Sequence, residues 1–304
     1  MKIGYIGLGN IGKYLASSLV REGFEVIVHD LNKDAAAALL EAGASWAESP
    51  AETARLADTV ITCLPSPEVV AAVLTGENGV LSGMEPGDTW IDMSTNDPHE
   101  LQRLAAIAAE KGVATLEAPV TGGVHTAASG SITVMVGGDE AVYTAHLPAF
   151  QAMGGKVFYI GVLGKATIIK VITNMLAFIH LCAAGEALML AKRGGIDLGL
   201  AYEVIKASSG NSFVHETESQ VILNGSYNIN FTMDLARKDL HFAYEMGREF
   251  GVPLELAGLV EQIFARARAS YGGDAFSPMV CKLLEDACGT DLRAPGFPCE
   301  LEPV

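Results

Sequence analysis

Short apolar runs alternate with amphipathic segments through the first half of the chain. The apolar runs have the length of β-strands, which are expected at Lys2–Ile6, Glu25–His29, Thr59–Leu64, Thr89–Met93, Ala114–Ala118, Ile132–Val136 and Val157–Ile160. Apolar residues at helical spacing predict helices at Ile11–Arg21, Lys33–Glu41, Asp97–Glu110 and Glu140–Met153. This alternation predicts an α/β fold with a doubly wound, mostly parallel sheet and helices on both of its faces.

After Gly164 the pattern becomes helical. The segment Lys165–Arg193 predicts one long helix that ends at the Gly194-Gly195 pair. Further helices are expected at Leu198–Ala207, Phe213–Leu223, Asp234–Glu249, Leu254–Tyr271 and Pro278–Ala287. We therefore expect an α/β domain at residues 1–163 and an all-helical domain at residues 164–304, with the long helix joining them. The proline-containing tail after Thr290 is expected to be an extended strap or disordered.

Composition and charge narrow the classes of function. Half of the residues are hydrophobic and the formal net charge is −16, with no basic stripe of the kind that nucleic-acid binding requires. An anionic ligand must therefore be held by backbone N–H groups and a few cations. The apolar stretch Ile168–Leu190 contains Lys170, Asn174, His180 and Glu186, which favours a buried helix over a membrane span.

The cysteines favour a reducing compartment. They are scattered, odd in number and without Cys-x-x-Cys or zinc-type spacing, at positions Cys63, Cys182, Cys281, Cys288 and Cys299. The chain enters a strand at once, without the pattern of a signal peptide. We expect a soluble, cytoplasmic protein with no metal site.

A glycine-rich loop follows the first predicted strand. Gly7, Gly9 and Gly12 stand in Gly-x-Gly-x-x-Gly register before an amphipathic helix. The three glycines permit, in turn, a tight turn, the approach of a pyrophosphate and close helix–strand packing, and the helix N-terminus offers N–H groups to the phosphates. The pattern predicts a Rossmann-type dinucleotide site at Gly7, Leu8, Gly9, Asn10, Ile11 and Gly12.

An acidic residue ends the second predicted strand. A carboxylate at Asp30 accepts hydrogen bonds from the ribose hydroxyls and repels a 2′-phosphate. The next residues are Leu31 and Asn32, with no arginine. We assign Asp30 and Leu31 to the cofactor and expect NAD to be preferred, with NADP possible.

Two later strands are followed by polar loops, 63–67 and 93–96. As local structure, both are turns with helix N-caps, since Pro and Ser are common there. Open α/β sheets bind ligands at the carboxyl ends of their strands. The position of the loops at that edge favours a role in the cofactor site.

A third loop, Glu117–Gly123, ends in adjacent glycines. Consecutive N–H groups at Gly122 and Gly123 suit a carboxylate, and the Thr121 hydroxyl can bond the same group. The alternative is a plain strand-to-helix turn.

A lysine in the long helix is the candidate for proton transfer. Lys170 and Asn174 are four residues apart and share a face among apolar neighbours. Desolvation lowers the pKa of a lysine toward neutrality, where it can exchange a proton with a substrate hydroxyl. The alternative is a lysine that extends from a buried helix to solvent. From spacing alone, Lys238 and Asp239 lie on an exposed charged helix face.

Together these residues resemble the β-hydroxyacid dehydrogenases, in their 3-hydroxyisobutyrate dehydrogenase-like group. The matching motifs occur in the family's order over nearly the whole chain: the 7–12 fingerprint, 64–67, 92–95, 118–123 continuing through Gly130 to 135–138, Gly164 with Lys170 and Asn174, and Phe231 with 238–240. Several ordered motifs are more specific than any one of them.

The resemblance implies roles that spacing does not. Lys170 would be the catalytic acid–base, and Asn174 would assist Thr121, Gly122 and Gly123 in holding the substrate. Further contacts to the cofactor would come from Leu64, Pro65, Ser94, Thr95 and Lys238. Phe213 and Phe231 would line the substrate pocket. Members typically form dimers or tetramers through the helical domain, so we expect a homodimer or homotetramer.

The chain departs from the family pattern in the third loop. Thr121 replaces the usual Ser and keeps the hydroxyl. His125 and Thr126 stand where a small or apolar residue and then Gly are usual. His125 is either an ordinary helix residue or a contact to a second polar or anionic group of the substrate.

We therefore expect an NAD-preferring oxidoreductase that interconverts a small anionic 3-hydroxy acid and its semialdehyde or 3-oxo acid. Candidate substrates are 3-hydroxyisobutyrate, tartronate semialdehyde, 2-(hydroxymethyl)glutarate, threonate and sulfolactaldehyde. One alternative is an imine reductase of the same fold, although these typically have another residue at the position of Lys170. The other is a non-catalytic dinucleotide-binding module.

Overall fold

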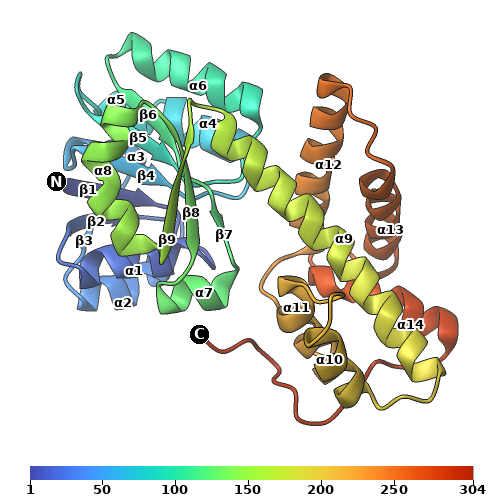
Figure 1. The fold of residues 1–304 in the computed structure, drawn as a ribbon. Helices are drawn as coiled ribbons and strands as arrows, with labels where there is room; N and C mark the ends of the chain where they lie inside the picture. Colours follow the sequence, from blue (N-terminus) through green and yellow to red (C-terminus); the bar gives the residue numbers. More distant parts are fainter. Residues whose placement is uncertain (304) are drawn as a thin grey trace. The chain divides into compact units, whose positions relative to one another are not determined.

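The computed structural model describes residues 1–303 (Figure 1). The chain forms two compact units, with Met1–Lys170 in the first and Val171–Glu302 in the second. The division falls inside the helix α9, Lys165–Arg193, seven residues after the boundary that composition predicts at residue 163. The first turn of α9 belongs to the α/β unit because a strand residue binds its amides, as described below.

A single sheet organises the first unit. Its strands run in the order β3-β2-β1-β4-β5-β6-β8-β7, and β9 pairs with β8. Their bounds are β1 Lys2–Ile6, β2 Glu25–His29, β3 Ser45–Trp46, β4 Thr59–Thr62, β5 Thr89–Asp92, β6 Ala114–Glu117, β7 Val120–Thr121, β8 Thr133–Gly138 and β9 Lys156–Gly161. The run from β3 to β6 is parallel, and β8 pairs antiparallel with β6 and β7. This confirms the predicted mostly parallel, doubly wound sheet.

Alternation along the strands produces one core on each face of the sheet. In β1, Ile3 and Tyr5 enter one cluster, and Ile6 enters another. The first cluster is covered by α1 Gly12–Arg21, α2 Ala37–Glu41, α7 Val124–Ser129 and α8 Glu140–Met153; the second is covered by α3 Pro50–Arg55, α4 Pro67–Thr75, α5 Val80–Gly83 and α6 Pro98–Glu110. Strands buried on both sides are the expected outcome of this architecture.

Several short elements in this unit show no hydrophobic periodicity in the sequence. The helices α3, α4 and α5 were not predicted, and neither were β3 and β7. A helix of four to nine residues completes too few turns to show an apolar stripe. Local chemistry marks two of these helices, since Ser49 and Ser66 each cap a helix that has proline in its first turn.

The second unit is helical. After α9 come α10 Leu198–Lys206, α11 Phe213–Asn224, α12 Met233–Phe250, α13 Glu255–Tyr271 and α14 Lys282–Cys288, with 3₁₀ turns η1 Lys33–Ala36 in the first unit and η2 Ser277–Cys281 here. Within the described part of this unit the β-pairing is one isolated bridge, between Thr232 and Phe276. A core that includes Phe178, Leu188 and Phe264 holds the helices together.

The tail forms a strap along the helical unit. Asn224 Nδ2 donates to the Phe297 carbonyl, and Ser226 Oγ donates to the Cys299 carbonyl at 2.7 Å. Arg293 anchors its beginning by an ion pair of 2.8 Å with the buried Glu285. Of the two alternatives for the tail, the strap is the observed one.

Helix α9 is long and apolar enough to span a membrane by length and composition. In its most apolar window 39% of the residues are buried. Phe178, Leu181, Leu188 and Met189 belong to the core of the helical unit, so part of its apolar surface is used in packing against neighbouring helices.

Candidate active site

The glycine-rich loop between β1 and α1 has the shape that a pyrophosphate needs. Gly7 has φ +99°, and a Cβ there would collide with the carbonyl oxygen of Cys63. A Cβ on Gly12 would collide with the carbonyl oxygen of Gly7. A Cβ on Gly9 would meet nothing within 4 Å, so this glycine leaves an open approach to the backbone. The loop therefore fits a dinucleotide phosphate at the start of α1.

Asp30 closes this loop against the end of β2. Its Oδ2 accepts a 2.7 Å hydrogen bond from the Leu8 amide, and its Oδ1 accepts one of 2.8 Å from the Asn32 amide. The following side chain, Leu31, is fully exposed. The carboxylate that was predicted from the motif thus stands directly beside the glycine loop.

A buried polar network fixes the two neighbouring loops. The Asp92 carboxylate, at the end of β5, accepts hydrogen bonds from Thr62 Oγ1 at 3.0 Å and Asn96 Nδ2 at 2.9 Å. Ser94 also donates its amide to Asp92, and its hydroxyl accepts the Leu64 amide at 2.9 Å. Burial raises the pKa of Asp92, and these donors act in the opposite direction. The network holds the predicted cofactor loops, 64–65 and 94–95, to the same sheet edge.

The third loop folds around its glycines. Gly122 and Gly123 both have positive φ, at +132° and +89°. Thr126 Oγ1 donates to the Gly123 carbonyl at 3.0 Å. The His125 ring lies 3.3 Å from the position of a Cβ on Gly123. His125 is buried, and burial lowers its pKa, so its ring is neutral at physiological pH.

The first turn of α9 is attached to the sheet through Glu117, the last residue of β6. The Glu117 carboxylate accepts the amides of Ala166 and Thr167 at 2.9 Å each, and also the Thr167 hydroxyl. Lys170 follows one turn later on the same helix and is 9% exposed. The candidate acid–base is thus a buried lysine rather than a surface charge.

In the helical unit, Asn174 and Lys238 are connected through Asp239. Asn174 Nδ2 donates to Asp239 Oδ2 at 2.6 Å, and Lys238 Nζ lies 2.9 Å from Asp239 Oδ1. Asp239 is buried and the side chain of Lys238 is 20% exposed, so this is not the open charged face that spacing suggests. Phe231 stacks on Phe178 in the core, whereas Phe213 is 57% exposed.

Three acidic residues of this region were not assigned roles from the sequence. Asp92, Glu117 and Asp239 are each buried and each hold a predicted site residue or its loop. Their only sequence signal is position: two end strands at the ligand edge of the sheet, and the third stands beside Lys238.

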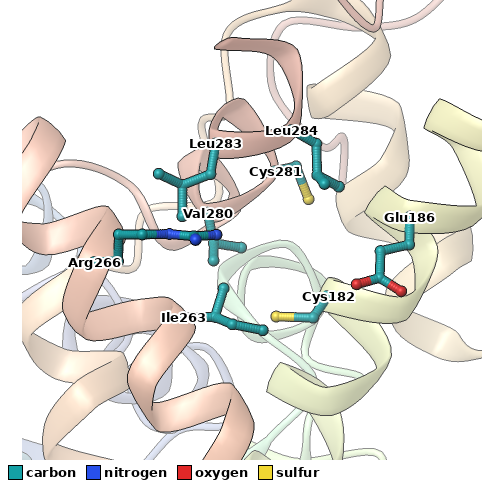
Figure 2. A pocket seen from close by; sticks show the side chains of 8 residues that line it. All are labelled: Cys182, Glu186, Ile263, Arg266, Val280, Cys281, Leu283 and Leu284. Atoms are coloured by element: carbon teal, nitrogen blue, oxygen red, sulfur yellow. The ribbon is translucent and has the colours of Figure 1, made fainter. Parts of the chain in front are cut away.

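A separate pocket lies within the helical unit (Figure 2). Its lining is aliphatic apart from Glu186 on α9, Arg266 on α13 and two thiols. Burial and nearby acids raise the pKa of Cys182 to about 12. Burial also raises the pKa of Cys281 well above its usual value, so both thiols stay protonated and are poor nucleophiles. Among the described residues no group of three or more His, Cys, Asp or Glu side chains is placed to bind a metal.

Two family models cover most of the chain. The NAD-binding domain of 6-phosphogluconate dehydrogenase matches residues 2–161, and the NAD-binding model of NADP-dependent 3-hydroxyisobutyrate dehydrogenase matches residues 164–284.

Characterised relatives match over almost the whole length. A 2-(hydroxymethyl)glutarate dehydrogenase from Eubacterium barkeri is 35% identical over 96% of this chain and 97% of its own. An L-threonate dehydrogenase from Cupriavidus necator is 36% identical, with coverages of 91% and 94%. The crystal structure of a 3-hydroxyisobutyrate dehydrogenase from Salmonella typhimurium superposes with a TM-score of 0.87 at 33% identity, covering 93% of this chain and 99% of that one. An imine reductase from Streptomyces aurantiacus, at 20% identity and a TM-score of 0.60, shares the fold alone.

Proposed function

This chain belongs to the β-hydroxyacid dehydrogenase family, in its 3-hydroxyisobutyrate dehydrogenase-like group, and on that premise we propose that it interconverts a small 3-hydroxy acid and its semialdehyde or 3-oxo acid, with NAD preferred and Lys170 as general acid–base. Family membership makes it an NAD(P)-dependent dehydrogenase that acts on CH–OH groups. The substrate, the cofactor preference and the lysine's role are the proposal.

The observation that carries the proposal is the placement of Lys170. It is a buried lysine on the first turns of α9, and Asn174 is one turn further along the same helix. In the oxidation direction the Lys170 amine accepts the proton of the substrate hydroxyl, and in reduction it returns that proton. A bound nicotinamide supplies the hydride exchange at the same carbon.

The neighbouring residues supply orientation. Asp239 accepts one N–H of the Asn174 amide at 2.6 Å, so it fixes the orientation of that side chain. We assign the substrate hydroxyl to the Asn174 amide group. The Thr121 hydroxyl and the amides of Gly122 and Gly123 bind the carboxylate. Because the substrate is bound at several points, its hydroxyl is already oriented toward Lys170 before proton transfer.

The preference for NAD is supported by Asp30. The carboxylate stands beside the glycine loop, where a 2′-phosphate would meet a negative charge. No arginine neighbours it in sequence.

His125 supports a substrate with a polar group beyond the carboxylate and the reacting hydroxyl. Its ring lies against the glycine pair of the third loop, neutral and therefore able to donate and accept a hydrogen bond. Among the candidates, tartronate semialdehyde, 2-(hydroxymethyl)glutarate, threonate and sulfolactaldehyde carry such a group, whereas 3-hydroxyisobutyrate carries a methyl group in its place.

Exposed apolar side chains on the helical unit support assembly into a homodimer or homotetramer. Leu190, Leu200, Leu256 and Leu259 are between 59% and 76% exposed, and exposed apolar surface is typical of protein interfaces. Light scattering coupled to gel filtration tests this, and a monomer at micromolar concentration contradicts it. The free cysteines support the expected cytoplasmic location.

The test of the proposed function is a screen of the five candidates, each as hydroxy acid or as aldehyde, with NAD and with NADP. Absorbance of the reduced cofactor reports turnover. We expect at least one 3-hydroxy acid to give a kcat/KM above about 10⁴ M⁻¹s⁻¹ with NAD. Activity on imines alone, or none with any hydroxy acid, contradicts the proposal.

A further inference from the structure

Glu117 binds the N-terminal end of the helix that carries Lys170. The carboxylate is 1% exposed and accepts two amides and one hydroxyl from Ala166 and Thr167. Because these partners all donate, the arrangement is built for the ionised carboxylate. Burial raises the pKa of Glu117, and the donors oppose that rise.

Lys170 lies on the same face of α9, one turn after Ala166. It is four residues after Ala166 and three after Thr167, and all three residues are buried. Long helical side chains lean toward the N-terminus of their helix. A lysine at position 170 can therefore reach back toward the turn that Glu117 holds.

Charge matters at this end of α9. The N-terminus of a helix carries a partial positive charge, which disfavours a second positive charge on an ammonium group nearby. The ionised carboxylate of Glu117 brings a full negative charge within hydrogen-bond distance of these N-terminal amides. Asp92, the register partner of Glu117 on β5, binds Thr62, Ser94 and Asn96 instead.

Two other charged positions on or beside α9 are described by the structure. Lys165, at the start of α9, is exposed. One turn beyond Lys170, Asn174 engages the Lys238–Asp239 ion pair of the helical unit. Glu117 is the acid bonded directly to the turn of α9 that precedes Lys170.

We propose that Glu117 is the positioning residue for Lys170: its carboxylate fixes the first turn of α9 against β6 and supplies the negative charge that stabilises the protonated amine. This inference rests on the proposed role of Lys170. Gly137 is part of the arrangement, because a Cβ at that position would collide with Oε1 of Glu117. The absence of a side chain at Gly137 therefore provides the space in which the Glu117 carboxylate lies.

The test compares two near-isosteric variants of the full chain. Glu117→Gln removes the charge, and Thr167→Val removes one donor but keeps the charge. The pKa of the Lys170 amine is measured without substrate, by trace acetylation across pH and mass spectrometry, with the exposed Lys165 as internal reference. We expect E117Q to lower the Lys170 pKa by about one pH unit and T167V to leave it nearly unchanged.

Turnover gives the second readout. General-base action needs the neutral amine, so the acid limb of kcat for alcohol oxidation moves about one pH unit lower in E117Q, and the alkaline limb for reduction moves down with it. A lower melting temperature with an unchanged Lys170 titration marks a purely structural cap and overturns the proposal. If E117Q does not fold, Gly137→Ala is the variant to test, because its Cβ displaces the Glu117 carboxylate. We expect kcat to fall about tenfold and the Kd for NAD to stay unchanged. Unaltered kcat and unaltered Lys170 acetylation overturn the proposal.

The outcome is separable from that of the proposed function. If Lys170→Ala retains turnover, the proposed mechanism fails, whatever the titration shows. If Lys170→Ala is inactive but E117Q leaves the titration unchanged, only the role of Glu117 fails.

Discussion

Asp30 and Leu8 are joined by a hydrogen bond of 2.7 Å between a side-chain carboxylate and a backbone amide. The bond links the end of β2 to the middle of the glycine loop, twenty-two residues earlier in the chain. One acidic residue therefore shapes the loop and also sets the charge beside it, and cofactor choice and loop geometry are expected to change together when it is altered.

Asp30→Asn keeps the size of the side chain but removes its charge. We expect KM for NAD to rise about tenfold and the ratio of kcat/KM for NAD over NADP to fall by at least about tenfold, because a charged hydrogen bond and a repulsion toward the 2′-phosphate are both lost. Steady-state kinetics with both cofactors measure this. Asp34→Asn, at an exposed acid nearby, makes the same charge change as a control. An unaltered cofactor ratio contradicts the role of Asp30.

Lys170→Ala tests the acid–base assignment. We expect kcat to fall about 10²–10⁴-fold, the usual contribution of general acid–base catalysis, while the Kd for NAD changes less than about twofold. Stopped-flow turnover and cofactor fluorescence titration measure the two quantities. Lys165→Ala, at the exposed lysine of the same helix, is the matched control and should retain wild-type kcat. Near-normal turnover in the Lys170 variant contradicts the acid–base assignment.

His125→Ala tests substrate selection. Loss of a buried hydrogen-bond partner is expected to lower kcat/KM about tenfold for threonate or 2-(hydroxymethyl)glutarate, with little effect on 3-hydroxyisobutyrate. Because burial lowers the pKa of His125 below 6.5, its contribution should persist through pH 6.5 and disappear only as the pH falls through the lowered pKa. His241→Ala, at an exposed histidine, is the control. An unchanged ranking of hydroxy acids rules out this role.

Glu218→Gln tests a source of instability in the helical unit. Glu218 Oε2 is buried without a hydrogen-bond partner, and burial raises the pKa of this carboxyl to about 8. The unfolded chain releases this proton near pH 4.5, so the folded state binds more protons between pH 4.5 and 8, and stability decreases across that window as the pH rises.

The Gln variant lacks this titration. Its free energy of unfolding relative to wild type is expected to increase from pH 5 to pH 8, by roughly 3 kcal/mol. Chemical denaturation at several pH values measures it, with the exposed Glu203→Gln as control. A difference that does not depend on pH would show that Glu218 is ionised in the folded protein.

Much of the fold follows from local pattern. Strand–helix alternation predicted the strands from β1 to β9 except β3 and β7, and the unbroken apolar segment predicted α9 in full. Motif spacing located the glycine loop and Asp30, because Gly7, Gly12 and the strand end that carries Asp30 are close in sequence as well as in space. The short helices were missed because they make too few turns to show a period.

The supporting residues of the site were not predictable in the same way. Glu117 binds residues about fifty positions later, and Asn174 binds Asp239 sixty-five positions later. No local pattern encodes such pairs. From sequence, Glu117 is a polar strand end and Asp239 is one charge among several on an amphipathic helix, and only the folded chain shows which amide each one meets.

The place where the two units divide has a practical meaning for anyone cloning fragments of this gene. A recombinant nucleotide-binding half that stops at residue 163 would lack the amides that donate hydrogen bonds to Glu117. This carboxylate would then be buried without these partners. A reading frame extended through Lys170 keeps those contacts, so we expect the longer fragment to express in soluble form and the shorter one to aggregate.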